Sequence, residues 1–274
     1  MSSKKAFKDF FHVSENLVKH RFKAIYYRDG AGGLRLGRVL EFSTAKFTES
    51  GWETSGGKPP LATVPREADT AGNSERSARR ARKLANDLIQ NNPELHWFVT
   101  LTFSPDCVED KSDFAECYRL LKVYLSNAVA RRGLAYLGTV ERTKAGDVHF
   151  HFLFNDGCDY VLSKNPHTGK PVEFNGELIY NVPGWRWGFT TAQDMNAGNA
   201  NRDKAAAYVL KYITKDRPAD TGGRYIYKGG RLLYPVEKCG DSLADFGAEN
   251  AQPTFEKAVD GTCLVYREYT FGNP

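Results

Sequence analysis

The sequence predicts an α+β fold in which helices cover a largely antiparallel sheet. Two observations lead to this class. Strand and helix patterns follow one another in the order strand, helix, strand, strand, helix, and the strands are mostly linked by short hairpin loops. The length of 274 residues suits one medium domain with extensions or two small ones. We divide the chain into a variable N-terminal leader (residues 1–73), a central domain (74–235) and a C-terminal extension (236–274).

The composition is that of a globular protein that works in a reducing compartment. Hydrophobic residues make up 41% of the chain and charged residues 26%, with a formal net charge of +5. We expect no membrane span, because no apolar run approaches about 18 residues. The first residues are basic without a following apolar stretch, so we expect no secretory signal and a cytoplasmic protein. The five cysteines form no CxxC pair, which argues against a zinc finger.

The first half of the chain begins with turn-rich segments and then becomes regular. The leader contains GAGGLRLG (30–37) and SGWETSGGKPP (50–60), so only short strands such as 38–42 are expected there. A helix is expected from about Ser74, because alanine and leucine recur at helical spacing, and Asn91-Asn92-Pro93 should end it.

The first turns of this helix are basic. They carry one acid, Glu75, against five cations: Arg76, Arg79, Arg80, Arg82 and Lys83. Such a run is often a solvated helix face. The alternative is a helix whose cations contact DNA phosphates.

The regular elements of the central domain follow from their patterns. HWFVTLTF (96–103) reads as a strand, and Ser112 can cap a helix that stops at Gly133. AYLGTVER (135–142) and VHFHFLF (148–154) read as two strands of a hairpin. After a broken stretch, residues 202–215 predict a helix and residues 222–235 a hairpin. CLVYREYTF, near the end of the chain, reads as a last strand.

Two histidines stand in the middle of the second hairpin strand. Alternation sends His149 and His151 to one face of the sheet and Phe150 to the other. Two polar residues on an exposed face would give the same pattern. If residues 143–147 form the loop, however, Glu141 lies opposite His149, about 5 Å away. Two imidazoles and a carboxylate form a known catalytic metal site that suits Mn²⁺ and tolerates Mg²⁺.

A pair of tyrosines lies on the predicted helix 202–215. Tyr208 and Tyr212 are one turn apart and face the same way, with Lys211 beside them. They could simply pack at the edge of an amphipathic helix. The functional alternative is a pair of phenolic nucleophiles, with Lys211 lowering the phenol pKa or neutralising developing charge.

The segments FVTLTF, GDVHFHFLF and YVLKYITK together resemble the HUH endonuclease superfamily, and more narrowly the replication initiators of small single-stranded DNA phages and related rolling-circle plasmids. The resemblance covers about residues 74–235 and includes WRWGF (185–189). It implies a central five-stranded, mostly antiparallel sheet with His149 and His151 on a central strand as metal ligands. It also implies Tyr208 and Tyr212 as nucleophiles, and hence the two-tyrosine branch. Glu141 matches the third ligand by its position on the preceding strand.

The resemblance implies a metal-dependent endonuclease and strand transferase in a bacterial host. Its partners would be single-stranded or hairpin origin DNA, a host polymerase and a host helicase, since no GxxxxGK[ST] phosphate loop is present. Trp185 and Trp187 could stack on unpaired bases or belong to the core. Two alternatives remain: a one-tyrosine transposase or relaxase, and a non-catalytic domain that binds single-stranded nucleic acid.

Overall fold

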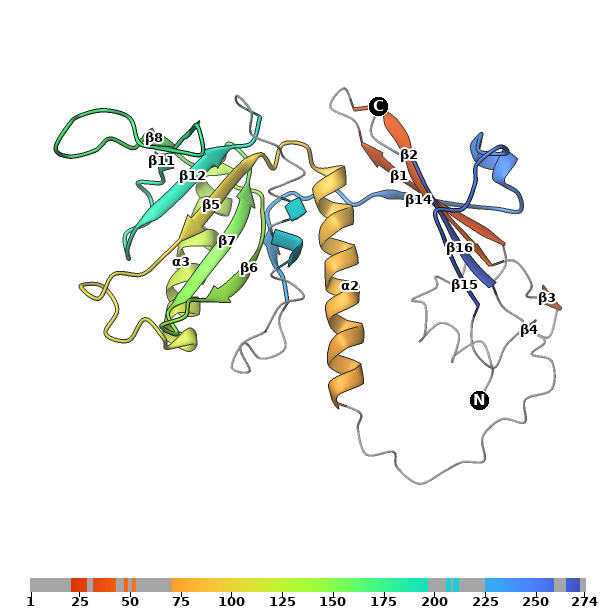
Figure 1. Cartoon of the computed structure of the whole chain (residues 1–274), viewed down its shortest axis with the longest axis horizontal. Coiled ribbons are helices and arrows are strands. Elements are labelled where there is room, and N and C mark those ends of the chain that lie inside the picture. Colours follow the sequence, from red (N-terminus) through yellow and green to blue (C-terminus); the bar gives the residue numbers. More distant parts are fainter. Residues whose placement is uncertain are drawn as a thin grey trace. The chain divides into compact units, whose positions relative to one another are not determined.

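The chain folds into two compact units, each with its own antiparallel sheet (Figure 1). One unit comprises residues 1–67 and 235–274, and the other comprises residues 68–234. The computed structural model describes residues 21–28, 32–42, 47–48, 51–52, 70–196, 206–207, 209–211, 225–258 and 265–271. None of the helices in these ranges is long and apolar enough to cross a membrane.

The first unit joins strands from the two ends of the chain. Its five-stranded sheet has the order β14-β1-β2-β16-β15. The strands are β1 (Phe22–Arg28), β2 (Leu34–Phe42), β14 (Val236–Gly240), β15 (Phe255–Ala258) and β16 (Val265–Thr270), with a separate pair β3 (Phe47–Thr48) and β4 (Gly51–Trp52) and a short helix η2 (Leu243–Phe246). Glu41 is buried in this sheet and accepts hydrogen bonds from Arg21 and Tyr269, which satisfies its charge.

The second unit is built on a seven-stranded antiparallel sheet of order β13-β6-β7-β5-β12-β11-β8. Its strands are β5 (Trp97–Leu101), β6 (Tyr136–Arg142), β7 (Val148–Phe154), β8 (Val161–Leu162), β11 (Tyr180–Asn181), β12 (Thr190–Asp194) and β13 (Tyr227–Gly229). A small hairpin pairs β9 (Glu173–Phe174) with β10 (Glu177–Leu178). The α+β class and the antiparallel sheet are confirmed.

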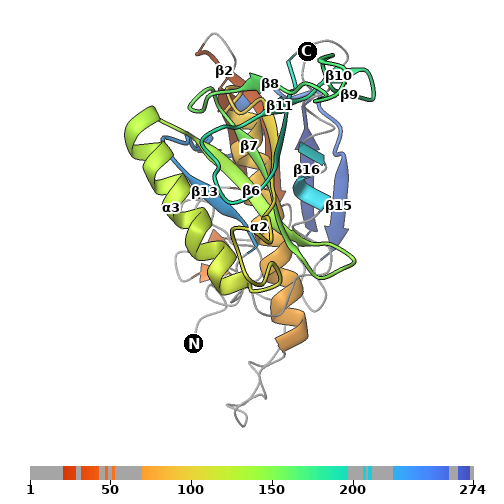
Figure 2. The same cartoon turned by 90° about the vertical axis from the view of Figure 1, so that its left-hand side faces the viewer.

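Strand alternation gives this sheet two different faces. On β7, Phe150, Phe152 and Phe154 point to one face, where they pack with the buried side of α3 (Phe114–Arg132). Leu153 points to the other face, in a core with α2 (Thr70–Asn91) and the helical residues 206–211. Figure 2 shows α3 lying across the strands on its side of the sheet. We call these the α3 face and the histidine face, because the second also carries His149 and His151.

Three local expectations need correction. The sheet has seven strands where five were expected, since the broken stretch contributes two-residue strands (β8 and β11) that alternation cannot reveal. The cap of α3 is Asp113, not Ser112, because the Asp113 carboxylate accepts hydrogen bonds from two first-turn N–H groups. The hairpin expected over residues 222–235 is wrong, because β13 pairs with β6 instead.

Candidate functional site

The two histidines of β7 lie on an interior strand, between β6 and β5. His151 is buried and His149 is half-buried, while Phe150 between them is fully buried on the α3 face. The strand is thus fixed from one side by its aromatic residues. This packing sets the direction of both imidazoles.

The β6–β7 hairpin brings a carboxylate to the same face. Its register pairs Glu141 with His149 and Arg142 with Val148, as the loop at residues 143–147 predicts. The Glu141 side chain leans toward the next histidine, so that Glu141 Oε2 lies 2.8 Å from His151 Nε2. On the other side, the Thr100 hydroxyl of β5 lies 3.1 Å from His151 Nδ1. Both ring nitrogens of His151 therefore have a polar partner.

The close pairing of β6 with β7 depends on a glycine. Gly138 stands opposite Phe152 in the ladder. A Cβ atom at this position would lie 2.2 Å from the His151 carbonyl oxygen and 2.3 Å from the Phe152 ring. Any larger residue would push β6 away from β7 and so separate Glu141 from His151.

Burial sets the protonation of both imidazoles. Desolvation lowers the pKa of His149 and of His151 below the usual histidine value. The negative charge of Glu141 opposes this shift in both residues, and in His151 it does so partly through its hydrogen bond. The balance favours neutral imidazoles at neutral pH, and neutral imidazole is the form that binds metals.

The donor set fits a divalent metal, although its atoms are not gathered as a closed site. Within the described ranges, no three His, Cys, Asp or Glu side chains lie close enough together to hold an ion. Two ligand atoms at a right angle, each about 2.1 Å from an ion, are about 3 Å apart. The 2.8 Å contact between His151 and Glu141 is close to this separation. His149, directly opposite Glu141, can supply the second nitrogen from the same face.

Thr100 was not predicted from the sequence, yet it suits a supporting role at this site. Its hydroxyl can donate to or accept from His151 Nδ1. When it accepts the Nδ1 proton, the Nε2 lone pair is left free for a ligand. The only sequence signal for Thr100 is that it faces the sheet interior on β5, and strand pairing with His151 is needed to give that meaning.

The helix that carries the predicted nucleophiles packs on the histidine face. Ala206, Val209 and Leu210 are buried there in one core with Leu137 and Leu153. Lys211 of the same helical segment is exposed. Tyr208 and Tyr212 lie outside the described residues, so their roles remain predictions.

The basic helix α2 borders the same core. Its buried side is formed by Ala85, Leu88 and Ile89, which pack on the histidine face. The predicted phosphate-contacting side chains Arg79, Arg80, Arg82 and Lys83 are all exposed. The side chain of Arg76 lies outside the described part of the chain. Exposure suits both the solvated face and the phosphate-contacting face, so the choice between them stays open.

The tryptophans take the core alternative. Trp185 is 5% exposed, and its indole N–H donates to the Thr102 carbonyl at 2.8 Å. A ring so buried has no face free for a base, so the stacking role predicted for Trp185 is corrected. Trp187 is half-buried against the same core, on the α3 side of the sheet.

An exposed aromatic ring stands beside the histidine face. Phe189 is 75% exposed and continues the β12–β5 ladder, because its carbonyl accepts the N–H of Thr102 at 3.0 Å. Thr191, two residues on, pairs with Thr100. Alternation therefore directs Phe189 to the face that carries the histidines.

The comparisons with known proteins give one match. Residues 96–217 match the family model of replication-associated proteins that covers ORF2 and the gene 2 protein. The matched range contains β5, the β6–β7 hairpin and the helical segment 206–211. No curated protein and no solved structure matches the chain.

Proposed function

We propose, from the family match over residues 96–217, that the protein is a replication-associated enzyme that nicks and rejoins single-stranded origin DNA to start rolling-circle replication. One observation carries the proposal. His149, His151 and Glu141 share a sheet face with the helical segment that bears the predicted nucleophiles. The matched range thus brings together ligand-type side chains and a phenol-bearing helix, as DNA strand transfer requires.

We assign His149, His151 and Glu141 as the residues that would hold Mg²⁺ or Mn²⁺. When bound, such an ion would polarise the scissile phosphate as a Lewis acid. Thr100 would orient the His151 ring through Nδ1, and Glu141 would keep its carboxylate beside Nε2. These contacts fix the ligands before DNA arrives, which lowers the cost of ordering them in the reaction.

The nucleophile in this proposal is Tyr208. Its phenol loses a proton, its oxygen forms a bond to phosphorus, and the bond from phosphorus to the 3′ oxygen breaks. The products are a 5′-phosphotyrosine and a free 3′-OH that primes a host polymerase. Tyr212 then attacks the regenerated junction, and the freed 3′-OH seals the displaced strand by reversing the tyrosine linkage. Lys211 would neutralise the developing phenolate charge.

The histidine face also offers contacts for the strand being cut. Phe189 presents an exposed ring on which an unpaired base could stack. The exposed cations of α2 would contact phosphates at the border of the same core. We expect the substrate to be a single-stranded or hairpin origin, opened by a host helicase.

A covalent-capture experiment tests the proposal. The full chain is incubated with Mn²⁺ and labelled single-stranded fragments of its own replicon, and denaturing gels report protein–DNA adducts. We expect one fragment to give an adduct and a nicked product. The variant Tyr208→Phe/Tyr212→Phe should give none, whereas Tyr234→Phe, an exposed tyrosine on a loop, should react normally. Binding without any adduct or nick would favour the non-catalytic nucleic-acid-binding domain.

A further inference from the structure

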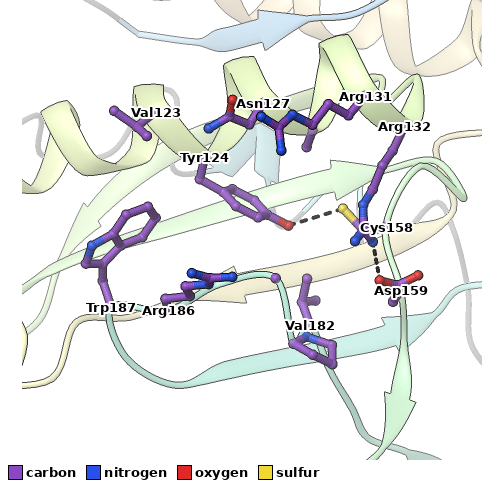
Figure 3. A pocket seen from close by; sticks show the side chains of 13 residues that line it. Val123, Tyr124, Asn127, Arg131, Arg132, Cys158, Asp159, Val182, Arg186 and Trp187 are labelled. Atoms are coloured by element: carbon purple, nitrogen blue, oxygen red, sulfur yellow. Dashed lines mark hydrogen bonds and ion pairs between the residues drawn. The ribbon is translucent and has the colours of Figure 1, made fainter.

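A cavity lies on the α3 side of the sheet, away from the histidine face. Its volume is about 510 Å³, within the range that holds small organic ligands. The C-terminal half of α3 forms one wall, and residues 182–187, between β11 and β12, form the other (Figure 3). The proposed chemistry on the opposite face uses none of these residues.

The floor of the cavity is neutral. The Tyr124 hydroxyl lies 3.1 Å from the Cys158 sulfur, so each polar group has a partner. Burial raises the pKa of the Tyr124 phenol and of the Cys158 thiol, which keeps both uncharged at neutral pH. Val182 and the aromatic ring of Tyr124 supply apolar surface beside them. Such a floor suits a flat, uncharged ring.

The rim of the cavity is cationic. Arg131 and Arg132 come from the last turn of α3, and Arg186 comes from the facing segment (Figure 3). Arg132 is paired with Asp159, which cancels its charge. Within the part of the chain that the structure describes, no carboxylate forms an ion pair with Arg131 or Arg186.

Arg131 could be explained without a ligand, because cations are favoured at a helix C-terminus. Arg186 belongs to no helix, so that explanation does not extend to it. Two guanidinium groups on opposite walls therefore remain available to an anion. Guanidinium is the side chain best suited to bind phosphate in two-pronged fashion.

Trp187 supplies an aromatic wall that is already held in place. Its ring meets Trp185 edge to face at a centroid distance of 5.1 Å, and it remains half-buried at the cavity. Since Trp185 is fixed by its hydrogen bond to Thr102, the Trp187 ring has a buried support. A base that stacks on Trp187 would gain contact at little ordering cost.

We propose that this cavity binds a nucleotide, with the base against Trp187 and Tyr124 and the phosphate between Arg131 and Arg186. Neutral floor, aromatic wall and cationic rim match the three parts of such a ligand. The nucleotide could be free or part of a single strand. The site does not depend on the nicking reaction and would remain if that reaction were absent.

The test is reversible binding to the full chain, without Mn²⁺, measured by calorimetry with dTMP, thymidine, inorganic phosphate and the oligonucleotide (dT)₆. We expect dTMP to bind more tightly than thymidine or phosphate. Arg131→Gln/Arg186→Gln should weaken dTMP binding at least about tenfold, because two charge-assisted hydrogen-bonding groups are removed from the phosphate. Trp187→Ala should weaken it too, and Trp187→Phe should restore most of the affinity. Thermal melting of each variant checks that the fold is kept.

Arg119→Gln is the matched control, since Arg119 lies on α3 but pairs with Glu116 and does not line the cavity. Loss of binding for dTMP and (dT)₆ alike would assign a free nucleotide as a sufficient ligand. Loss for (dT)₆ with no dTMP binding in the unmodified protein would assign a strand. The proposal is overturned if dTMP and (dT)₆ bind equally to the unmodified and double-arginine proteins, or if phosphate binds as well as dTMP and ignores Trp187. Covalent nicking is measured separately, so failure of one proposal leaves the other standing.

Discussion

His151 Nε2 and Glu141 Oε2 lie 2.8 Å apart, although the residue directly opposite Glu141 in the ladder is His149. The carboxylate therefore leans along the strand and interacts with both imidazoles. Its negative charge acts on the pKa of each histidine. A single carboxylate placed between two neutral imidazoles is the arrangement from which the metal proposal follows.

Removing the imidazoles should remove the metal. His149→Ala/His151→Ala is expected to lose Mn²⁺ binding in calorimetry and adduct formation on gels, while circular dichroism stays unchanged. Thr100→Val should be milder, with about 10- to 100-fold weaker Mn²⁺ binding, because only the support of His151 is removed. His167→Ala, on an exposed turn, serves as the control. Equal Mn²⁺ binding by the double variant and the unmodified protein would rule out this site.

Neutralising the basic side of α2 should change how DNA binding depends on salt. Changing Arg79, Arg80 and Arg82 to Gln is expected to lower the slope of log K against log salt by nearly one unit for each phosphate that the helix no longer touches. Fluorescence anisotropy at several salt concentrations measures the slope. Arg119→Gln on α3 should leave it unchanged. If the α2 variant also keeps the original slope, its cations are only a solvated helix face.

The hairpin site followed from the sequence because its parts are local. A loop of fixed length sets the register, and alternation then places Glu141, His149 and His151 on one face. Thr100 could not be found in this way, because it reaches His151 only after β5 pairs with β7 across a long sequence separation. The five-stranded sheet of the first unit has the same origin: β1 and β2 pair with β14 and β16 from the far end of the chain. Local pattern cannot report such pairings.

Burial also separated aromatic residues that the sequence placed together. Trp185, Trp187 and Phe189 lie within five residues, but Trp185 is in the core and Phe189 is exposed. The bend at Gly188 allows this change of side: a Cβ atom there would lie 2.3 Å from the Thr102 carbonyl oxygen. Which ring of WRWGF reaches solvent depends on this close approach and not on residue type.

Phe189 should therefore contribute to the binding of single strands. Phe189→Ala is expected to weaken single-stranded DNA binding by about 1 to 3 kcal/mol, the usual effect of losing one stacked base. Phe189→Tyr should retain the affinity. Duplex DNA, whose bases are already stacked, should bind the unmodified and Ala proteins alike. Competition assays with both kinds of DNA check this, and equal loss on both would point to a structural effect.

Thiol labelling should distinguish the cysteines by pH. Burial raises the pKa of Cys117 to about 12, and Cys107 is exposed. Iodoacetamide, which reacts with thiolates, should modify Cys107 and spare Cys117 at pH 8 to 9 in the folded protein. Above the ordinary thiol pKa of about 8.5, the unfolded chain releases a proton that folded Cys117 keeps, so the free energy of unfolding should fall as pH rises. Peptide mass mapping measures the labelling; early modification of Cys117 would contradict the burial.

The last prediction concerns the division of labour between the two tyrosines. Tyr208 and Tyr212 are one helical turn apart, on a segment whose buried residues pack on the histidine face. A nucleophile that holds the covalent 5′ end cannot attack again, so ending a round needs a second phenol or a second subunit. We expect Tyr208→Phe and Tyr212→Phe each to keep some adduct formation on oligonucleotides, and the double variant to form none. Neither single variant should release circular single strands in a replication assay.

The result also decides between the related activities. If Tyr212→Phe completes full rounds normally, Tyr212 is structural and the one-tyrosine transposase or relaxase is favoured. If Tyr208→Phe alone removes every adduct, Tyr208 is the only initiating nucleophile. Lys211→Ala helps to separate these cases, because an exposed lysine beside the nucleophile should affect the rate without affecting the fold. A slower rate that recovers as pH rises toward the phenol pKa of about 10 would indicate that Lys211 assists deprotonation.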